Sequence, residues 1–245
     1  MADKTQITEI KRLARQGESV NEIKDKLDLA KSTVYYHFKK EVGQKQKENQ
    51  VKIPEDEEVK GEICGIFAGD GNFHHDNNGH YRMQFFLNYN DEYWKELKDF
   101  LSDKLRKEPM VFHNEEKSRT VIRYSSKKLY EMIKEHLEWE DDKTVSIRLK
   151  NQQESREFKS GFLRGLIDTD GYKEKKFRRY IYGTISRSLR DNFSEILDEL
   201  DISHTTYKEK ARKDGWRDMH KVRITGDSAE KFSEEVTPRH PKKQY

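Results

Sequence analysis

One nine-residue segment occurs twice in this chain, with its two copies 100 residues apart. Residues 63–71 are ICGIFAGDG and residues 163–171 are LRGLIDTDG. Both segments are rich in apolar residues, have glycine in third place and end in Asp-Gly, so Asp70 corresponds to Asp170. Further along, Arg123 in TVIRYSS corresponds to Arg223 in HKVRITG. Such self-similarity predicts two copies of one structural unit.

Small residues recur at a spacing of four within each copy. Gly65 and Gly69 have this spacing in the first, and Gly165 and Thr169 have it in the second. Residues four apart share one face of a helix, and small side chains there let two helix backbones approach closely. We therefore expect the two segments to pack as helices along this face. The glycine after each final aspartate is expected to take a left-handed conformation that ends the helix.

Close packing of these helices would bring Asp70 and Asp170 together. Two adjacent carboxylates repel each other, and a cation between them relieves the repulsion. Mg²⁺, a hard cation that prefers oxygen ligands, is the expected ion. The alternative is that both aspartates are ordinary solvated helix caps, which would be the usual interpretation of either one alone.

The stretches after the two segments alternate between strand and helix patterns. The first copy predicts strands within 73–89 and 111–124, with an Asn77-Asn78-Gly79 hairpin turn, and helices at 91–107 and 126–137. The second predicts strands within 172–187 and 204–225, and helices at 188–200 and 228–236. The expected fold class is therefore α+β, with one unit at 60–150 and the other at 151–245.

The repeated segments resemble the motif of the LAGLIDADG homing endonucleases, and the resemblance covers about residues 60–245. In that family two motif helices pack side by side at a pseudo-twofold axis between two αββαββα units, which form a DNA-binding saddle. Each helix delivers one acid to a shared metal site, which implies that Asp70 and Asp170 are metal-binding and catalytic. Ala68 departs from the motif, because it stands where the first Asp would be.

The resemblance also implies catalytic lysines. Lys143 fits the family position in the first copy, and either Lys242 or Lys243 fits it in the second, with Lys243 preferred. A polar strand residue that often assists has candidates in Gln84 and Thr184 by rough alignment.

One face of each predicted sheet is rich in basic and polar residues. Alternation places Arg82, Gln84 and Asn88 opposite Met83, Phe85 and Leu87. A strand ribbon with such a face can lie in the major groove of DNA. The predicted DNA contacts from the strands are Arg82, Gln84, Arg123, Arg178, Arg179, Lys208, Lys221 and Arg223.

Residues 1–43 contain three short helical patterns typical of a helix-turn-helix domain. Ser19 and Glu22 fit a capping box at the start of the second helix. The segment SVNEIKDKLDLAKSTVYYHFKK resembles the resolvase-type helix-turn-helix, and its third helix is the size of a recognition helix. The predicted DNA contacts there are Lys31, Ser32, Thr33, Tyr35, Tyr36 and His37. The alternative is a protein-interaction module.

Residues 44–59 lack apolar periodicity and are predicted to be a linker.

Composition argues against a disulfide-stabilised protein and against a membrane protein. The 49 basic and 46 acidic residues give a net charge of only +3, so the distribution of charge has to support a nucleic-acid partner. The single cysteine, Cys64, excludes a disulfide framework and is expected to be a small buried residue. No apolar window or signal pattern predicts a membrane partner, and a cytoplasmic, nucleoid-associated location is expected.

Together these features predict a Mg²⁺-dependent DNA endonuclease. The resemblance to the family implies that it makes a staggered double-strand break in a long target, and the duplication implies that this target is asymmetric. Duplication within one chain predicts a monomer. Two alternatives stay open, namely a DNA-binding transcription regulator that no longer cuts and a maturase that binds its own intron RNA. Retention of both Asp70 and Asp170 argues against the regulator, because a protein that only binds DNA does not need paired acids where phosphates approach.

Overall fold

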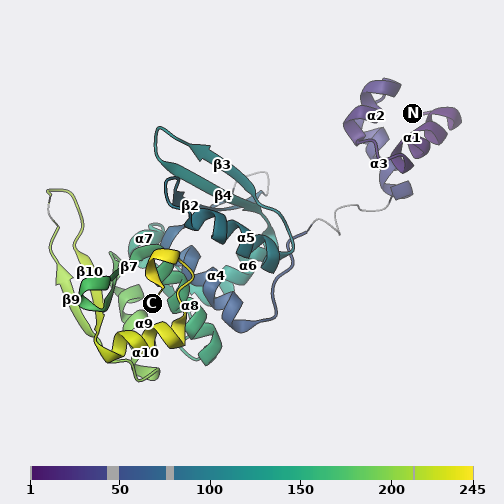
Figure 1. Cartoon of the computed structure of the whole chain (residues 1–245). Coiled ribbons are helices and arrows are strands. Elements are labelled where there is room, and N and C mark those ends of the chain that lie inside the picture. The colour runs from purple at the N-terminus through teal and green to yellow at the C-terminus, as the bar shows by residue number, and fades with distance from the viewer. Residues whose placement is uncertain (1, 43–49, 76–79, 212, 245) are drawn as a thin grey trace. The chain divides into compact units, whose positions relative to one another are not determined.

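The computed structural model describes residues 2–42, 50–75, 80–211 and 213–244. Contacts divide the chain into two compact units, Met1–Gln50 and Val51–Tyr245, which are drawn in Figure 1. Among the described residues, no helix combines the length and apolar character needed to cross a membrane.

The first unit is a three-helix domain made of α1 (Lys4–Arg15), α2 (Val20–Leu27) and α3 (Lys31–Val42). The capping box predicted at Ser19 and Glu22 is confirmed, with both reciprocal hydrogen bonds present. Asp28 follows α2 in the left-handed conformation and begins the tight connection to α3. A small core that includes Ile10, Ile23 and Val34 holds the three helices together. The described residues therefore form a three-helix domain, and its interpretation as a helix-turn-helix stays a prediction.

The second unit contains two copies of the order helix-strand-strand-helix-strand-strand-helix, which confirms the α+β prediction. The first copy is α4 (Glu57–Asp70), β1 (Gly71–His75), β2 (Tyr81–Asn88), α5 (Tyr93–Leu105), β3 (Met110–Asn114), β4 (Arg119–Ser125) and α6 (Lys127–His136). The second is α8 (Arg156–Asp170), β7 (Gly171–Glu174), β8 (Arg179–Thr184), α9 (Arg187–Glu199), β9 (Thr205–Glu209), β10 (Met219–Thr225) and α10 (Asp227–Val236). The predicted turn at residues 77–79 lies outside the described residues.

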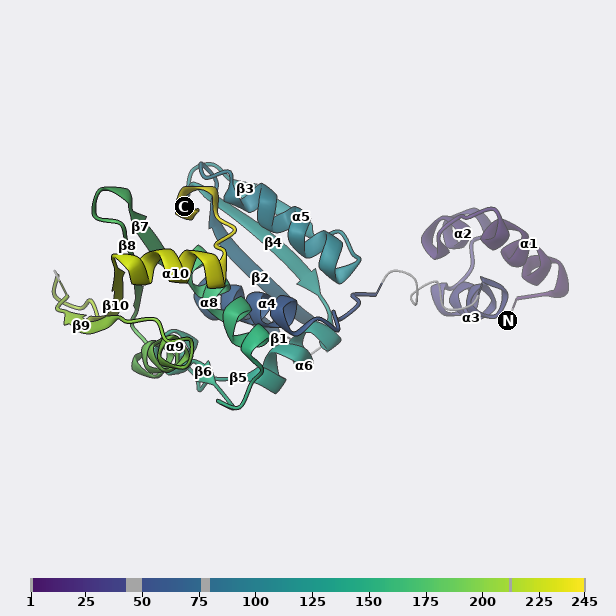
Figure 2. The same cartoon turned by 60° about the horizontal axis from the view of Figure 1, so that its bottom comes forward.

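Each copy forms a four-stranded antiparallel sheet, with strand orders β1-β2-β4-β3 and β7-β8-β10-β9. The motif helices α4 and α8 lie side by side between the two sheets (Figures 1 and 2). Met83, Phe85 and Leu87 point into the core, as the alternation predicted. Cys64 is fully buried, as expected for a small apolar residue.

The connection between the copies contains structure that the sequence patterns did not predict. Strands β5 (Leu137–Glu138) and β6 (Arg148–Leu149) pair with each other and flank the short helix α7 (Lys143–Ser146). This small ribbon fixes the segment that carries Lys143.

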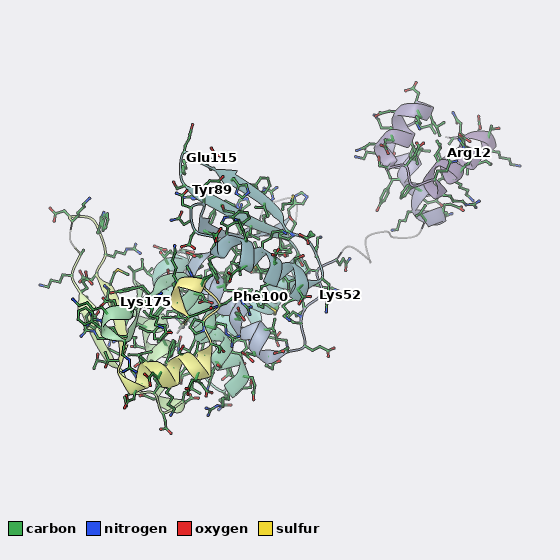
Figure 3. The ribbon with its side chains drawn as sticks, in the orientation of Figure 1. Arg12, Lys52, Tyr89, Phe100, Glu115 and Lys175 are labelled. Carbon is green, nitrogen blue, oxygen red and sulfur yellow. The ribbon has the colours of Figure 1, made fainter. Side chains whose placement is uncertain are left out.

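The predicted linker at 44–59 is wrong in its second half. Val51 is buried in the core of the second unit, the backbone amide of Lys52 donates to Leu105, and α4 already begins at Glu57 (Figure 3 labels Lys52). Lys and Glu residues around Val51 and Ile53 hid these two core positions from a search for periodicity.

The contact between α4 and α8 depends on missing side chains. A Cβ added at Gly65 would overlap the carbonyl oxygen of Phe162 and lie 3.0 Å from the Cα of Gly165. Gly61 and Gly161 face the other helix in the same way one turn earlier. The two backbones are therefore in direct contact at two successive turns, a closer approach than ordinary helix pairs make.

Buried charges flank this glycine contact. Glu62 is fully buried and accepts from Arg164 at 3.0 Å and from Arg239 at 2.6 and 3.0 Å. Arg164 also donates to the backbone carbonyl of Val236 at 2.7 Å. Because each buried charge has partners, removing one alone would leave the others uncompensated.

The glycines after the motif aspartates are not left-handed, so that expectation is wrong. Gly71 has φ −82° and Gly171 has φ −93°, both in the extended region. A side chain there would overlap Phe67 or Ile167 of the preceding turn. Space, not backbone conformation, requires glycine at these positions.

We expect Gly65→Ala to destabilise the second unit by about 1–3 kcal/mol or more, because the added methyl group must force the two helices apart. Denaturant unfolding followed by circular dichroism measures the change. Gly183→Ala is the matched control, since its added Cβ would lie 3.1 Å from the flexible end of Met219. Equal effects of the two substitutions would contradict this account of the helix contact.

Candidate metal centre and nucleic-acid interface

Asp70 and Asp170 are the last residues of α4 and α8. A Cβ built on Gly69 would lie 3.0 Å from Oδ2 of Asp170, so that carboxylate lies beside the end of the opposite helix. The helix packing therefore brings together the two acids that the repeat identified. Both lie at C-terminal helix ends, where the helix dipole is negative and favours a cation.

The pKa values of both acids are raised above those of ordinary aspartates. Burial and the neighbouring charge of Asp170 raise the pKa of Asp70 to about 7, against the opposing effect of Lys243 and Lys143. Burial among surrounding protein atoms raises the pKa of Asp170 to about 6. The side chain of Asp170 nevertheless stays exposed to solvent, so a ligand can reach it.

One lysine donates to the end of each motif helix. Lys143 Nζ donates to the carbonyls of Phe67 at 2.7 Å and Ala68 at 2.9 Å. Lys243 Nζ donates to those of Ile167 at 2.9 Å and Asp168 at 2.7 Å. The two contacts are equivalent in the two copies.

This equivalence decides between the two C-terminal lysines. Lys242 points elsewhere and pairs with Asp91 at 2.6 Å, so Lys243 is the counterpart of Lys143. Burial lowers the pKa of Lys143 and of Lys243 to about 8, although the nearby aspartates favour the charged form. Both lysines therefore lose their proton more easily than an exposed lysine, although both stay mostly protonated at pH 7.

The donor set at this centre fits a hard divalent cation. Two carboxylates supply oxygen ligands at one place, and no group of three His, Cys, Asp or Glu side chains forms a metal cage within the described ranges. Mg²⁺ is commonly held in this way, by one or two carboxylates together with water and substrate phosphate oxygens.

A cavity of about 170 Å³ adjoins the centre, and its lining includes Asp70, Thr169, Lys243, Asn88, Asp91 and Trp94. A larger cavity of about 870 Å³ is lined by Arg164 and Arg239 together with acidic residues of α5 and α10. It lies over the buried charge network, so its size does not mark the reactive centre.

The outer face of the first sheet carries the side chains that were predicted to contact DNA. Cross-strand pairing places Arg82, Gln84 and Arg123 opposite the buried face. Arg123 stacks on Phe112 with 4.5 Å to the ring centroid, and it is the cross-strand partner of Gln84. Glu115, near the far end of the β3–β4 hairpin, is labelled in Figure 3.

The outer face of the second sheet carries Arg179, Lys221 and Arg223. Arg223 stacks on Tyr207 at 4.6 Å, and its Nε has no hydrogen-bond partner among the described residues. Lys221 pairs with Glu209, and Arg179 pairs with Glu174.

Two predicted DNA contacts lie on the wrong side of this sheet. Lys208 is the cross-strand partner of His220 on the face that packs against helices, and it pairs with Asp218 at 2.7 Å. Arg178 lies in the turn before β8 and pairs with Glu230 of α10. A fixed offset of 100 residues and strict alternation did not account for the turn geometry here.

The suggested equivalence of Gln84 and Thr184 is also wrong. Gly71 pairs with Phe85, fourteen residues on, whereas Gly171 pairs with Tyr182, eleven residues on. The second hairpin is therefore three residues shorter, and Ile181 occupies the place of Gln84. Thr184 is buried and accepts from the backbone of Ser186.

The predicted contact residues of the three-helix unit lie on one helix, α3. Tyr35 and Tyr36 are 46% and 55% exposed although they are large and aromatic. Lys31 and Ser32 are also exposed, while Thr33 and His37 are half-buried. The contact of these side chains with DNA stays a prediction.

Several residues at the centre were missed from the sequence. Gly61 and Gly161 extend the spacing of four that had identified Gly65 and Gly165, so the signal was present. Asp168, whose carboxylate accepts from the backbone amides of Arg239 and His240, had no detectable partner in the sequence.

Comparison with known proteins agrees with this geometry. Residues 157–237 match the family model described as a LAGLIDADG-like domain. This segment is therefore a LAGLIDADG-like domain, and the second unit as a whole has the LAGLIDADG fold.

Two solved structures illustrate the fold. The homing endonuclease I-DmoI in complex with DNA and Mn superposes with a TM-score of 0.55 and 17% identity, over 75% of this chain and 98% of that one. The N-terminal LAGLIDADG domain of DUF199/WhiA superposes with a TM-score of 0.51 and 15% identity, over 76% of this chain and 86% of that one. At these identities the matches establish the fold alone.

One curated relative was also found. The chain is 26% identical over 166 residues to the ATP-dependent DNA helicase Hel308 of Thermococcus kodakarensis. The match covers 63% of this chain but only 14% of the helicase, so it concerns a small part of that protein.

The raised pKa values predict a pH-dependent effect of Asp70→Asn in EDTA. Asp70 ionises near pH 4 in the unfolded chain but near pH 7 in the folded protein, so ionisation destabilises the fold as pH rises across this window. The substitution removes this penalty, and we expect it to raise the unfolding temperature more at pH 8 than at pH 5. The conversion is about 2–4 °C per kcal/mol.

Differential scanning calorimetry at both pH values measures the effect. Asp99→Asn, at an exposed carboxylate on α5, is the control and should change neither midpoint. A gain for Asp70→Asn that is the same at pH 5 and pH 8 would contradict the assignment.

Proposed function

We propose that this protein is a site-specific DNA endonuclease that makes a divalent-metal-dependent, staggered double-strand break in a long asymmetric target. The observation that carries the proposal is the meeting of Asp70 and Asp170 at the ends of two packed helices, each end accompanied by one lysine that donates to its carbonyls. The fold shared with I-DmoI, which was solved with its target DNA and Mg or Mn, supports it.

Asp70 and Asp170 would hold the cation, expected to be Mg²⁺. When bound, such an ion activates water and stabilises charge on the scissile phosphate. Lys143 and Lys243 place an ammonium group beside each carboxylate, where each can donate to an oxygen that gains charge during the reaction. The arginines on the outer sheet faces neutralise the DNA backbone and orient the duplex.

The two sheet faces would contact different half-sites. The first offers the Gln84–Arg123 pair, whereas at the same place the second has Ile181, which is only 2% exposed, and offers Arg223 alone. An amide that can bond to adenine is thus replaced by an apolar side chain, which supports an asymmetric target bound by a monomer.

The test is selection of a bound and cleaved sequence from a DNA library, followed by cleavage of that sequence in a plasmid with Mg²⁺. We expect Asp70→Asn and Asp170→Asn each to slow cleavage at least about a thousandfold, roughly 4 kcal/mol, while DNA binding persists. Asp99→Asn is the matched carboxylate control. Specific binding without cleavage in Mg²⁺ or Mn²⁺ would overturn the proposal.

That negative result would support the second candidate, a DNA-binding regulator without nuclease activity. The fold shared with the LAGLIDADG domain of WhiA favours this candidate. The two differ in what the centre must do, since a regulator gains nothing from ionised acids facing phosphate.

We also propose that α3 of the three-helix unit contacts DNA. Lys31→Ala should then weaken DNA binding and reduce the slope of log K against log salt concentration by about 0.9, the contribution of one phosphate contact. Fluorescence anisotropy at several salt concentrations measures the slope. Lys24→Ala, at a lysine of α2 paired with Asp25, is the control. An unchanged slope would favour the alternative interpretation, in which this unit is a protein-interaction module.

A further inference from the structure

The segment after α10, residues 237–244, brings Lys243 to the centre, and we call it the strap. Several described side chains hold it in place. Asp168 Oδ2 accepts from the backbone amide of Arg239 at 2.9 Å, and its Oδ1 accepts from that of His240 at 3.1 Å. The hydroxyl of Tyr180 donates to the carbonyl of Lys243 at 2.7 Å.

Residues of the first copy hold the other side of the strap. His240 stacks on Tyr93 with 4.6 Å between ring centroids, and Lys242 pairs with Asp91. The strap thus spans the two copies at the point where their motif helices end.

The equivalent lysine of the first copy is held differently. Lys143 begins α7, which lies between the paired strands β5 and β6, so the backbone itself fixes its position. Position 68, which corresponds to Asp168, is alanine. The acid is present only in the copy whose lysine lies on a segment without a flanking strand ribbon among the described residues.

Asp168 is therefore not a third ligand of the centre. Its side chain is 2% exposed, and both of its oxygens are engaged by the strap. A buried carboxylate that accepts two backbone amides orients that backbone strongly, because leaving either amide unpaired would cost about 1–3 kcal/mol.

We propose that Asp168 is a positioning residue that docks the strap and so places Lys243, and that cleavage of one DNA strand depends on this contact while cleavage of the other does not. The inference rests on the proposed nuclease function for its consequence. The structural part of the inference, that Asp168 determines the position of Lys243, does not depend on that function.

The structural half is tested first, by acylation of lysine amines with acetic anhydride and mass spectrometry of the full chain. Lys243 is 8% exposed and should react slowly in the wild type. Asp168→Ala should raise its labelling rate about tenfold or more, while Lys143 in the same sample keeps its rate and shows that the fold is intact. Fragmentation separates Lys243 from Lys242. An unchanged rate at Lys243 would overturn the inference.

The functional half uses strand-resolved cleavage of a supercoiled plasmid that carries the selected target. Asp168→Ala should slow one strand on the order of 10–100-fold, typical for loss of a supporting residue, and nicked circles should accumulate. Lys243→Met should affect the same strand and Lys143→Met the opposite one. Asp168→Asn, which keeps one acceptor, should restore part of the rate.

The outcomes are distinguishable. Equal slowing of both strands by Asp168→Ala would overturn the positioning role, because general loss of folding predicts that result. No cleavage by the wild type would refute the nuclease, and the labelling result would then decide the positioning role by itself.

Discussion

The direct backbone contact between α4 and α8 is the constraint on which the rest of the second unit depends. Only glycine on both helices permits it, and it brings the ends of two helices that belong to different copies to one place. Carboxylates, lysine ammonium groups and helix carbonyls then gather within a few ångströms, and their mutual effects follow from that closeness. The same closeness explains why Glu62 must pair with Arg164 and Arg239, since its carboxylate is fully buried and has no water to compensate its charge.

The groups that could bind a cation at this centre lower the stability of the folded protein. In the absence of a cation both aspartates resist ionisation and both lysines resist protonation, so the folded protein holds groups that would be better solvated elsewhere. Such perturbed groups cluster at functional sites more often than by chance. The helix contact supplies the stability that tolerates them.

The order of helices and strands, the paired acids and the glycine face could be predicted because each depends on local spacing. The register of the second sheet could not, because the missing three residues lie in a turn whose length no periodicity reveals. That single difference moved Ile181 into the place of Gln84, and turn geometry likewise turned Arg178 and Lys208 away from the outer face. The role of Asp168 depends on a contact across 71 residues of chain, which no local pattern contains.

The charge network beside the glycines has a consequence for ancestry. Position 162, which corresponds to Glu62, is phenylalanine, and position 64, which corresponds to Arg164, is cysteine. Two second copies paired through α8 would bury two guanidinium groups with no carboxylate between them, and two first copies would bury two unpaired carboxylates. Either self-pairing carries an uncompensated charge that the mixed pair lacks. The two copies have thus diverged into complementary halves, one with the buried acid and one with the buried arginine. Neither half retains the charges needed to form a symmetric dimer with a second copy of itself, the arrangement from which a gene duplication of this kind would begin.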